Sequence, residues 1–196
     1  MKEKFIKRSY ENLKDFRKDR GKAINHLHDL FHMEKSERID KAFSERINLA
    51  VTQVNGCKMC SYAHAESALK TGMVKEEVES LLSGSFDNVP TEQMTALLFA
   101  QHYAETRGNP SPETWQEVIN TYGFKKSKNI MAHISVMMLS NMYGNTMEAF
   151  KLRLKGKAIK QSNLWKEIYV IIGFYSFYKK YLKEIGKKRK IKIAKS

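Results

Sequence analysis

Cys57, Cys60 and His64 are the residues of this chain whose types and spacing best suit chemistry. The two cysteines are the only ones in 196 residues, and His64 follows the second by four positions. In a helix, positions i, i+3 and i+7 lie on one face, so two thiols and a basic side chain would share one small surface. This arrangement favours thiol redox chemistry, because a second thiol converts a sulfenic acid to a disulfide before further oxidation.

The cysteines follow the turn signal Asn55-Gly56 and are predicted to open a helix that ends near Gly72. A preceding helix, with apolar residues at helical spacing, is predicted to begin at the N-cap Ser36 and to end at the turn. The two helices would form a hairpin. A helix N-terminus and a nearby imidazole lower a thiol pKa from about 8.5 toward roughly 3.5–7.5, which favours the reactive thiolate.

Glu45 is the candidate partner of His64. It lies ten residues before Asn55, and His64 lies eight residues after Gly56. Residues equally distant from the turn of an antiparallel hairpin lie at the same height, and a helix rises about 1.5 Å per residue. Glu45 and His64 are therefore predicted within roughly one turn of each other. Glu45 would orient the imidazole or accept its proton, whereas the alternative interpretation is an ordinary solvated carboxylate.

The spacing of Glu45, Cys57, Cys60 and His64 resembles that of AhpD-like alkylhydroperoxidases of the carboxymuconolactone decarboxylase superfamily. The residues that follow His64, as far as the Glu-Glu-Val sequence at 76–78, fit the same pattern. The resemblance is close over residues 38–82 and looser as far as residue 150. One difference is a methionine immediately before the second cysteine, where AhpD itself has a histidine.

The resemblance implies an all-helical homo-oligomer with a peroxide-reducing dithiol site. It assigns Cys60 as the thiol that attacks peroxide, Cys57 as the resolving thiol, and His64 with Glu45 as the proton relay. The predicted function is a thiol-dependent peroxidase that uses no cofactor or bound metal. Its partners would be a hydroperoxide substrate and a dithiol or protein thiol as electron donor.

Other interpretations of the same residues stay open. The cysteines could be small buried side chains, or Cys57, Cys60, His64 and Glu45 could bind zinc. A non-enzymatic oligomeric binding protein, with a structural or metal-holding site and a basic tail for membrane or nucleic acid, is the alternative from another class. A carboxymuconolactone decarboxylase-like enzyme is a further alternative, although that branch typically lacks the cysteine pair.

The composition predicts an all-α fold, because the chain has three prolines and ten glycines among many helix-forming residues. The tyrosine, glycine and asparagine at 143–145 are predicted to break a helix, which gives a faint echo of the cysteine hairpin. Gly21 interrupts the pattern of the first helix. Helices are expected over residues 11–33, 36–55, 57–72, 76–82, 91–106, 112–122, 128–143 and 164–185.

The net charge of +14 is concentrated at the C-terminal end. From Lys151 onward the chain has fifteen Lys and Arg and two acidic residues, whereas residues 1–150 carry a net charge of +1. We therefore predict an AhpD-like helical domain over residues 1–150 and a basic amphipathic helix with a disordered tail over residues 151–196. The basic segment is a candidate for contact with anionic membrane or nucleic acid.

The N-terminal residues mix charges without an apolar stretch, and no uncharged run approaches the ~20 residues that span a bilayer. A cytoplasmic protein is therefore expected.

His28 and His32 have the i, i+4 spacing of a metal pair but lack an acidic residue at its centre, so with His26 they are interpreted as surface residues. His102 and His133 lie among apolar residues and are interpreted as core or interface histidines.

Overall fold

A computed structural model describes residues 8–160 and 162–193 of the chain. The described residues form helices and no strand, which confirms the predicted all-α fold. Short 3₁₀ turns occur at Lys35–Glu37 and Thr91–Gln93. The helices are α1 (Leu13–Asn25), α2 (Leu27–Phe31), α3 (Lys41–Asn55), α4 (Lys58–Lys70), α5 (Lys75–Ser83), α6 (Met94–Glu105), α7 (Pro112–Tyr122), α8 (Phe124–Leu154) and α9 (Leu164–Ile193).

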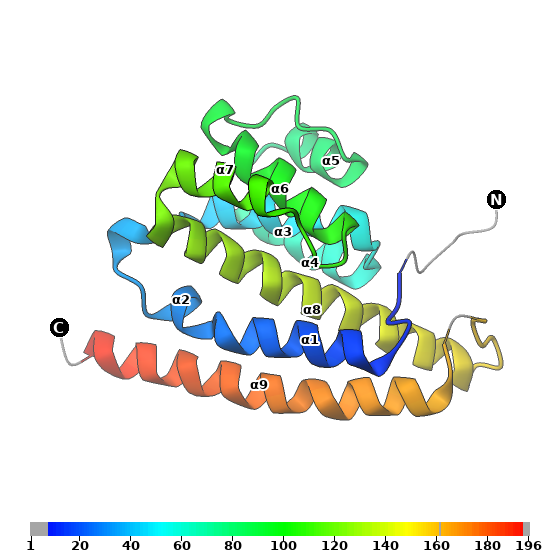
Figure 1. The fold of residues 1–196 in the computed structure, drawn as a ribbon. Coiled ribbons are helices and arrows are strands. Elements are labelled where there is room, and N and C mark those ends of the chain that lie inside the picture. The colour runs from blue at the N-terminus through cyan, green and yellow to red at the C-terminus, as the bar shows by residue number, and fades with distance from the viewer. Residues whose placement is uncertain (1–7, 161, 194–196) are drawn as a thin grey trace.

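The long helix α8 runs through the middle of the molecule (Figure 1). Helices α3 to α7 lie on one side of α8, whereas α1, α2 and α9 lie on the other. Each side has its own group of buried apolar residues. The first includes Ile47, Leu81, Leu97 and Ile134, and the second includes Phe16, Leu139, Val170 and Phe177. Helix α8 therefore contributes apolar residues to both cores.

The predicted hairpin is present as α3 and α4, joined at Gly56. This glycine adopts a left-handed conformation with φ 68°, and its N–H donates to the carbonyl of Thr52, as is typical of a helix C-terminus. The predicted N-cap of α3 was wrong. Ser36 lies in the first 3₁₀ turn, and Asp40 caps α3 by accepting the N–H of Phe43 at 2.7 Å.

Helix α8 continues through residues 143–145, so the predicted break and the echo of the cysteine hairpin were wrong. Gly144 is helical and lies against the cysteines, where a larger residue would not fit. The Asn145 side chain donates to the carbonyls of Arg8 and Asn55 at 2.8 and 2.9 Å. These two residues suggest a turn by type, but their role here is close packing between helices.

The first helix also differs from the prediction. It pauses at His26, where the cap N–H donates to Lys22 and Ile24, rather than at Gly21. Gly21 stays helical, with no atom within 4 Å of the place where a Cβ would lie. His28 is exposed, as predicted, but His32 turns inward: its Nε2 lies 2.6 Å from a carboxylate oxygen of Glu184 on α9, so His32 is not a surface residue.

Helix α9 packs along α1, α2 and α8. Arg153, at the end of α8, donates to both carboxylate oxygens of buried Glu167 at 2.8 and 2.9 Å, which fixes the start of α9. Further along, Phe174 stacks on Tyr143 with ring centroids 3.8 Å apart. The helix extends to Ile193 instead of ending near residue 185, and residues 194–196 of the predicted tail lie outside the described residues.

In the described part of the chain, no helix combines the length and apolarity needed to cross a membrane.

Candidate active site

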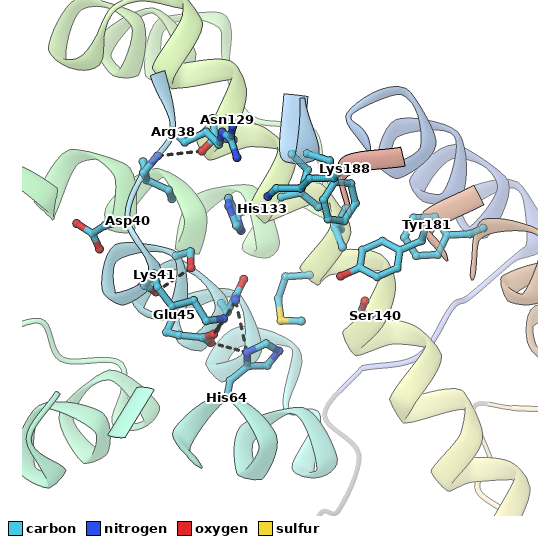
Figure 2. A pocket seen from close by; sticks show the side chains of 18 of the residues that line it. Arg38, Asp40, Lys41, Glu45, His64, Asn129, His133, Ser140, Tyr181 and Lys188 are labelled. Carbon is cyan, nitrogen blue, oxygen red and sulfur yellow. Dashed lines mark hydrogen bonds and ion pairs between the residues drawn. The ribbon is translucent and has the colours of Figure 1, made fainter. Parts of the chain in front are cut away.

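Glu45 and His64 meet where α3 and α4 lie side by side (Figure 2). A carboxylate oxygen of Glu45 lies 2.6 Å from Nδ1 of His64. The side chain of Asn48, one turn along α3, lies 3.3 Å from the same carboxylate oxygen. With the Nδ1 proton directed at Glu45, Nε2 of a neutral imidazole carries the lone pair and is able to accept a proton.

The carboxylate of Glu45 is fully buried, which rules out the solvated alternative. Lys41 and Ser67 donate to its other oxygen, Ser67 at 2.7 Å. Burial raises the pKa of Glu45, but the hydrogen bonds from His64, Lys41 and Ser67 outweigh this effect and hold the pKa at about 2. Glu45 is therefore an anion at neutral pH, with a fixed orientation toward the imidazole.

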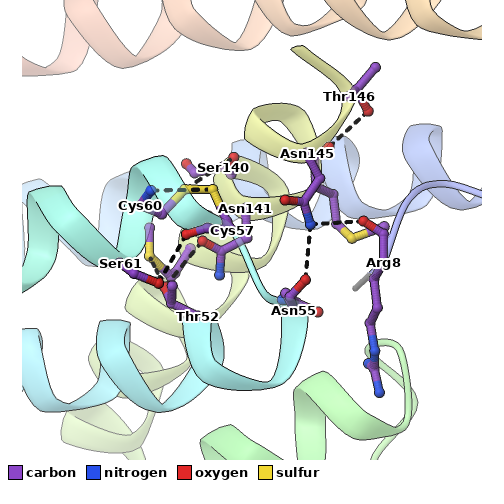
Figure 3. The surroundings of a disulfide bond; sticks show 12 residues. Arg8, Thr52, Asn55, Cys57, Cys60, Ser61, Ser140, Asn141, Asn145 and Thr146 are labelled. Atoms are coloured by element: carbon purple, nitrogen blue, oxygen red, sulfur yellow. Dashed lines mark hydrogen bonds between the residues drawn. A yellow bond between two sulfur atoms is a disulfide. The ribbon is translucent and has the colours of Figure 1, made fainter. Parts of the chain in front are cut away.

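Cys57 and Cys60 are joined by a disulfide at the beginning of α4 (Figure 3). Cys57 occupies the N-cap position, and its sulfur accepts the N–H of Cys60 at 3.3 Å. The exposed fractions of the two residues are 1% and 7%, so Cys60 is the more accessible. The structure shows the oxidised form of a pair placed at a helix N-terminus, where a thiolate of the reduced form is stabilised.

Helix α8 lies directly over the disulfide. A Cβ placed on Gly144 would lie 2.6 Å from the sulfur of Cys57 and 3.3 Å from that of Cys60. One turn earlier on α8, the carbonyl oxygen of Ser140 lies 4.0 Å from the Cys60 sulfur. The absence of a side chain at Gly144 therefore allows the backbone of α8 to approach both sulfurs.

A cavity of about 600 Å³ opens beside Glu45 and His64. Glu45, His64 and Ser140 line one part of it, and His133 of α8 lines another. Burial lowers the pKa of His133 to about 4, with further lowering by Lys41 and Lys188 and an opposing effect of Glu45. His133 is therefore neutral at pH 7. The remaining lining residues are Leu30, Phe31, Arg38, Ile39, Asp40, Lys41, Ser44, Asn48, Asn129, Val136, Met137, Phe174, Phe177, Tyr178, Tyr181 and Lys188.

The structure places Glu45 in contact with His64, and it bonds Cys57 to Cys60 at the beginning of the helix that carries His64. The zinc alternative does not describe this form, because the sulfurs are bonded to each other instead of being free thiolates. Among the described residues, no group of three or more His, Cys, Asp or Glu side chains is arranged to hold a metal ion.

Several residues of the site were missed in the sequence. Lys41 lies four residues before Glu45 and Ser67 lies three after His64, so helical spacing could have indicated both as partners. Gly144 and the cavity wall from α9 carried no such signal, because they lie 80 residues or more from the cysteines along the chain. His133, which was interpreted as a core or interface residue, lines the cavity.

The sequence model of the carboxymuconolactone decarboxylase family matches residues 24–102. This segment contains Glu45, both cysteines and His64, and it ends within α6. Neither the curated proteins nor the solved structures contained a match to the chain. Residues 24–102, with their helical hairpin and cysteine pair, are thus similar to the carboxymuconolactone decarboxylase family, as the spacing of the site residues predicted.

Proposed function

We propose that this protein is a thiol-dependent peroxidase that reduces hydroperoxides through a dithiol–disulfide cycle of Cys57 and Cys60. Members of the family that matches residues 24–102 are enzymes, and that family includes both decarboxylases and alkylhydroperoxidases. The observation that favours peroxidase chemistry is the disulfide at the N-terminus of α4, on the helix that carries His64, whose imidazole contacts Glu45 of α3. A redox cycle uses all four residues, whereas a decarboxylation gives the disulfide no role.

In the first step, His64 accepts the proton of the Cys60 thiol, and the thiolate attacks the terminal oxygen of the hydroperoxide. The O–O bond breaks and Cys60 becomes a sulfenic acid. The departing alkoxide takes the proton from His64 and leaves as an alcohol. Cys60 is the better candidate for attack, since it is the more exposed cysteine and its sulfur approaches the carbonyl of Ser140 at the cavity.

In the second step, the thiolate of Cys57 attacks the sulfur of the Cys60 sulfenic acid. A disulfide forms, and hydroxide leaves with a proton as water. An external dithiol or protein thiol then reduces this disulfide and is itself oxidised to a disulfide. The described structure corresponds to the state before this last exchange. We propose a homo-oligomer as the working form, as the family resemblance implies.

Ionised Glu45 would serve the cycle as a positioning residue. Its contact with Nδ1 of His64 leaves Nε2 free for proton transfer. The same contact stabilises the imidazolium that exists after His64 takes the Cys60 proton and before it gives a proton to the alkoxide. Ser67 and Lys41 hold the carboxylate from its other side. The buried anion thus carries out no covalent chemistry in this proposal.

The test is peroxide consumption by the purified protein with dithiothreitol, dihydrolipoamide or a thioredoxin as reductant. Wild-type protein should consume hydroperoxide, and Cys60→Ser should lose this activity. In Cys57→Ser, peroxide should leave a sulfenic acid on Cys60 that dimedone labels and mass spectrometry locates. Unchanged consumption by Cys60→Ser would exclude the proposed cycle, and a label confined to Cys57 of Cys60→Ser would reverse the two thiol roles.

A further inference from the structure

The cavity beside His64 has a second, positively charged region. Arg38 enters it from the segment before α3, and Lys188 enters it from the last turns of α9 (Figure 2). Nε of Arg38 donates to the carbonyl of Met33 at 2.7 Å, which holds the guanidinium in place. Burial and the charge of Arg38 lower the pKa of Lys188, so the two cations are near enough to repel each other.

The two carboxylates that line the same cavity, and that of Glu184 on α9, have other partners. Asp40 accepts the N–H of Phe43 at the beginning of α3. Glu45 accepts from His64, Lys41 and Ser67. Glu184, one turn before Lys188, contacts His32 and Lys187.

No carboxylate of the described residues forms an ion pair with Arg38 or Lys188, although both line a cavity. Two cations held together without a counter-ion are unfavourable, and a ligand anion between them would remove that repulsion. The terminal nitrogens of Arg38 suit a carboxylate, because a guanidinium offers paired N–H donors to its two oxygens.

The wall between the two regions is mainly apolar. Helix α9 contributes Phe174, Phe177, Tyr178 and Tyr181 to it, and Phe31 of α2 lies beside them. Contacts between aromatic rings fix this surface. The ring centroids of Phe31 and Tyr181 lie 5.1 Å apart in an edge-to-face arrangement, and those of Phe177 and Tyr181 lie 5.9 Å apart. A cavity of about 600 Å³ with an apolar wall and few polar groups is typical of a small-molecule site.

We propose that the cavity binds a hydroperoxide that also carries a carboxylate. The carboxylate would pair with Arg38 and Lys188, the apolar body would lie against the aromatic residues of α9, and the peroxide group would reach His64. The choice of a hydroperoxide rests on the proposed function, whereas the carboxylate and the apolar body rest on the cavity itself. His133 also lines the cavity, but its pKa of about 4 leaves it neutral at pH 7. It therefore does not compete with Arg38 and Lys188 for the carboxylate.

The first test measures binding alone and uses decanoate and decanol as probes, by isothermal titration with the oxidised full-length protein. Wild-type protein should bind decanoate at least about tenfold more tightly than decanol, because a charge-assisted pair favours the acid. In Arg38→Gln/Lys188→Gln this preference should disappear. Lys180→Gln/Lys183→Gln, which removes two exposed cations of α9 that do not line the cavity, should keep it.

The second test compares kcat/KM for a carboxylated hydroperoxide and for cumene hydroperoxide. The ratio of the two values should fall at least about tenfold in Arg38→Gln/Lys188→Gln and stay constant in the control pair. Peroxidase activity without an effect of Arg38 and Lys188 on either test would overturn the carboxylate site. Selective decanoate binding by a protein without peroxidase activity would instead overturn the proposed function and leave the site standing.

Discussion

A carboxylate oxygen of Glu45 lies 2.6 Å from Nδ1 of His64, and this contact joins α3 to α4 beside the cysteine pair. The two residues are 19 positions apart, and the tight turn at Gly56 brings them together. Buried Glu45 has a pKa of about 2, so it remains an anion across the pH range of ordinary assays. Nδ1 of the imidazole is therefore occupied by the contact with Glu45, whereas Nε2 is available for proton transfer.

Glu45→Gln tests this arrangement without a large change in shape. We expect kcat for peroxide reduction to fall about 100-fold, because the neutral amide no longer stabilises the imidazolium. KM should change little, and Glu45→Asp should recover part of kcat. Glu66→Gln is the control, since Glu66 is an exposed residue of α4 that pairs with Lys70. Equal losses of kcat in Glu45→Gln and Glu66→Gln would contradict the role assigned to Glu45.

Gly144→Ala should destabilise the oxidised protein by about 1–3 kcal/mol, because its Cβ would lie 2.6 Å from the Cys57 sulfur. Gly21→Ala is the matched control in another helix. There the Cβ meets no atom within 4 Å, so alanine should stabilise the fold by roughly 0.5–1 kcal/mol. Denaturant unfolding under oxidising conditions measures both. An unchanged free energy of unfolding for Gly144→Ala would show that α8 can move away from the disulfide at little energetic cost.

His133 should make the fold less stable in weak acid. Its pKa is about 4 in the folded protein, below the usual 6.5, so between these values the unfolded chain binds more protons. The free energy of unfolding therefore rises with pH between pH 4 and pH 6.5. As the pH falls through this window, the protein loses up to about 3 kcal/mol of stability. His133→Gln should flatten this dependence, whereas exposed His28→Gln should not. Parallel pH profiles of the unfolding free energy for wild type and His133→Gln would exclude this contribution.

Arg153→Gln should loosen the beginning of α9, because it leaves the buried carboxylate of Glu167 without its two strong hydrogen bonds. Amide hydrogen exchange in the first turns of α9 should become faster than in the wild type. Lys151→Gln, an exposed residue of the same last turn of α8, serves as the control. Unchanged exchange near Glu167 would show that packing against α1 and α8 is enough to hold α9.

Local patterns in the sequence predicted the hairpin well. The Asn55-Gly56 signal located the turn, and the equal distances of Glu45 and His64 from that turn placed the two residues side by side. The helix over residues 112–122 was also predicted with its observed bounds, because a serine N-cap and a following proline mark its start. These features depend on residues close together in the chain, where spacing determines geometry.

The remaining features depend on contacts between distant residues. Gly144 was interpreted as a break, because a glycine beside an asparagine usually marks a turn and nothing nearby in the sequence indicates a disulfide above it. Asp40 caps α3 in place of the predicted Ser36, although both residue types cap helices equally well. The approach of Lys188 to Arg38 follows from the packing of α9, which no local pattern specifies.

The family-matched segment contains the dithiol, the imidazole and its carboxylate, but it ends before α8 and α9, which supply half of the cavity wall. Under the proposed mechanism, the reacting groups lie in one stretch of the chain, whereas the cavity wall is shared between that stretch, which includes Arg38, and the C-terminal helices. Exchanging α9 between relatives is expected to alter which molecules the cavity accepts while leaving the contact between Glu45 and His64 intact. Homology over the matched segment therefore describes only part of the surface that would select the substrate.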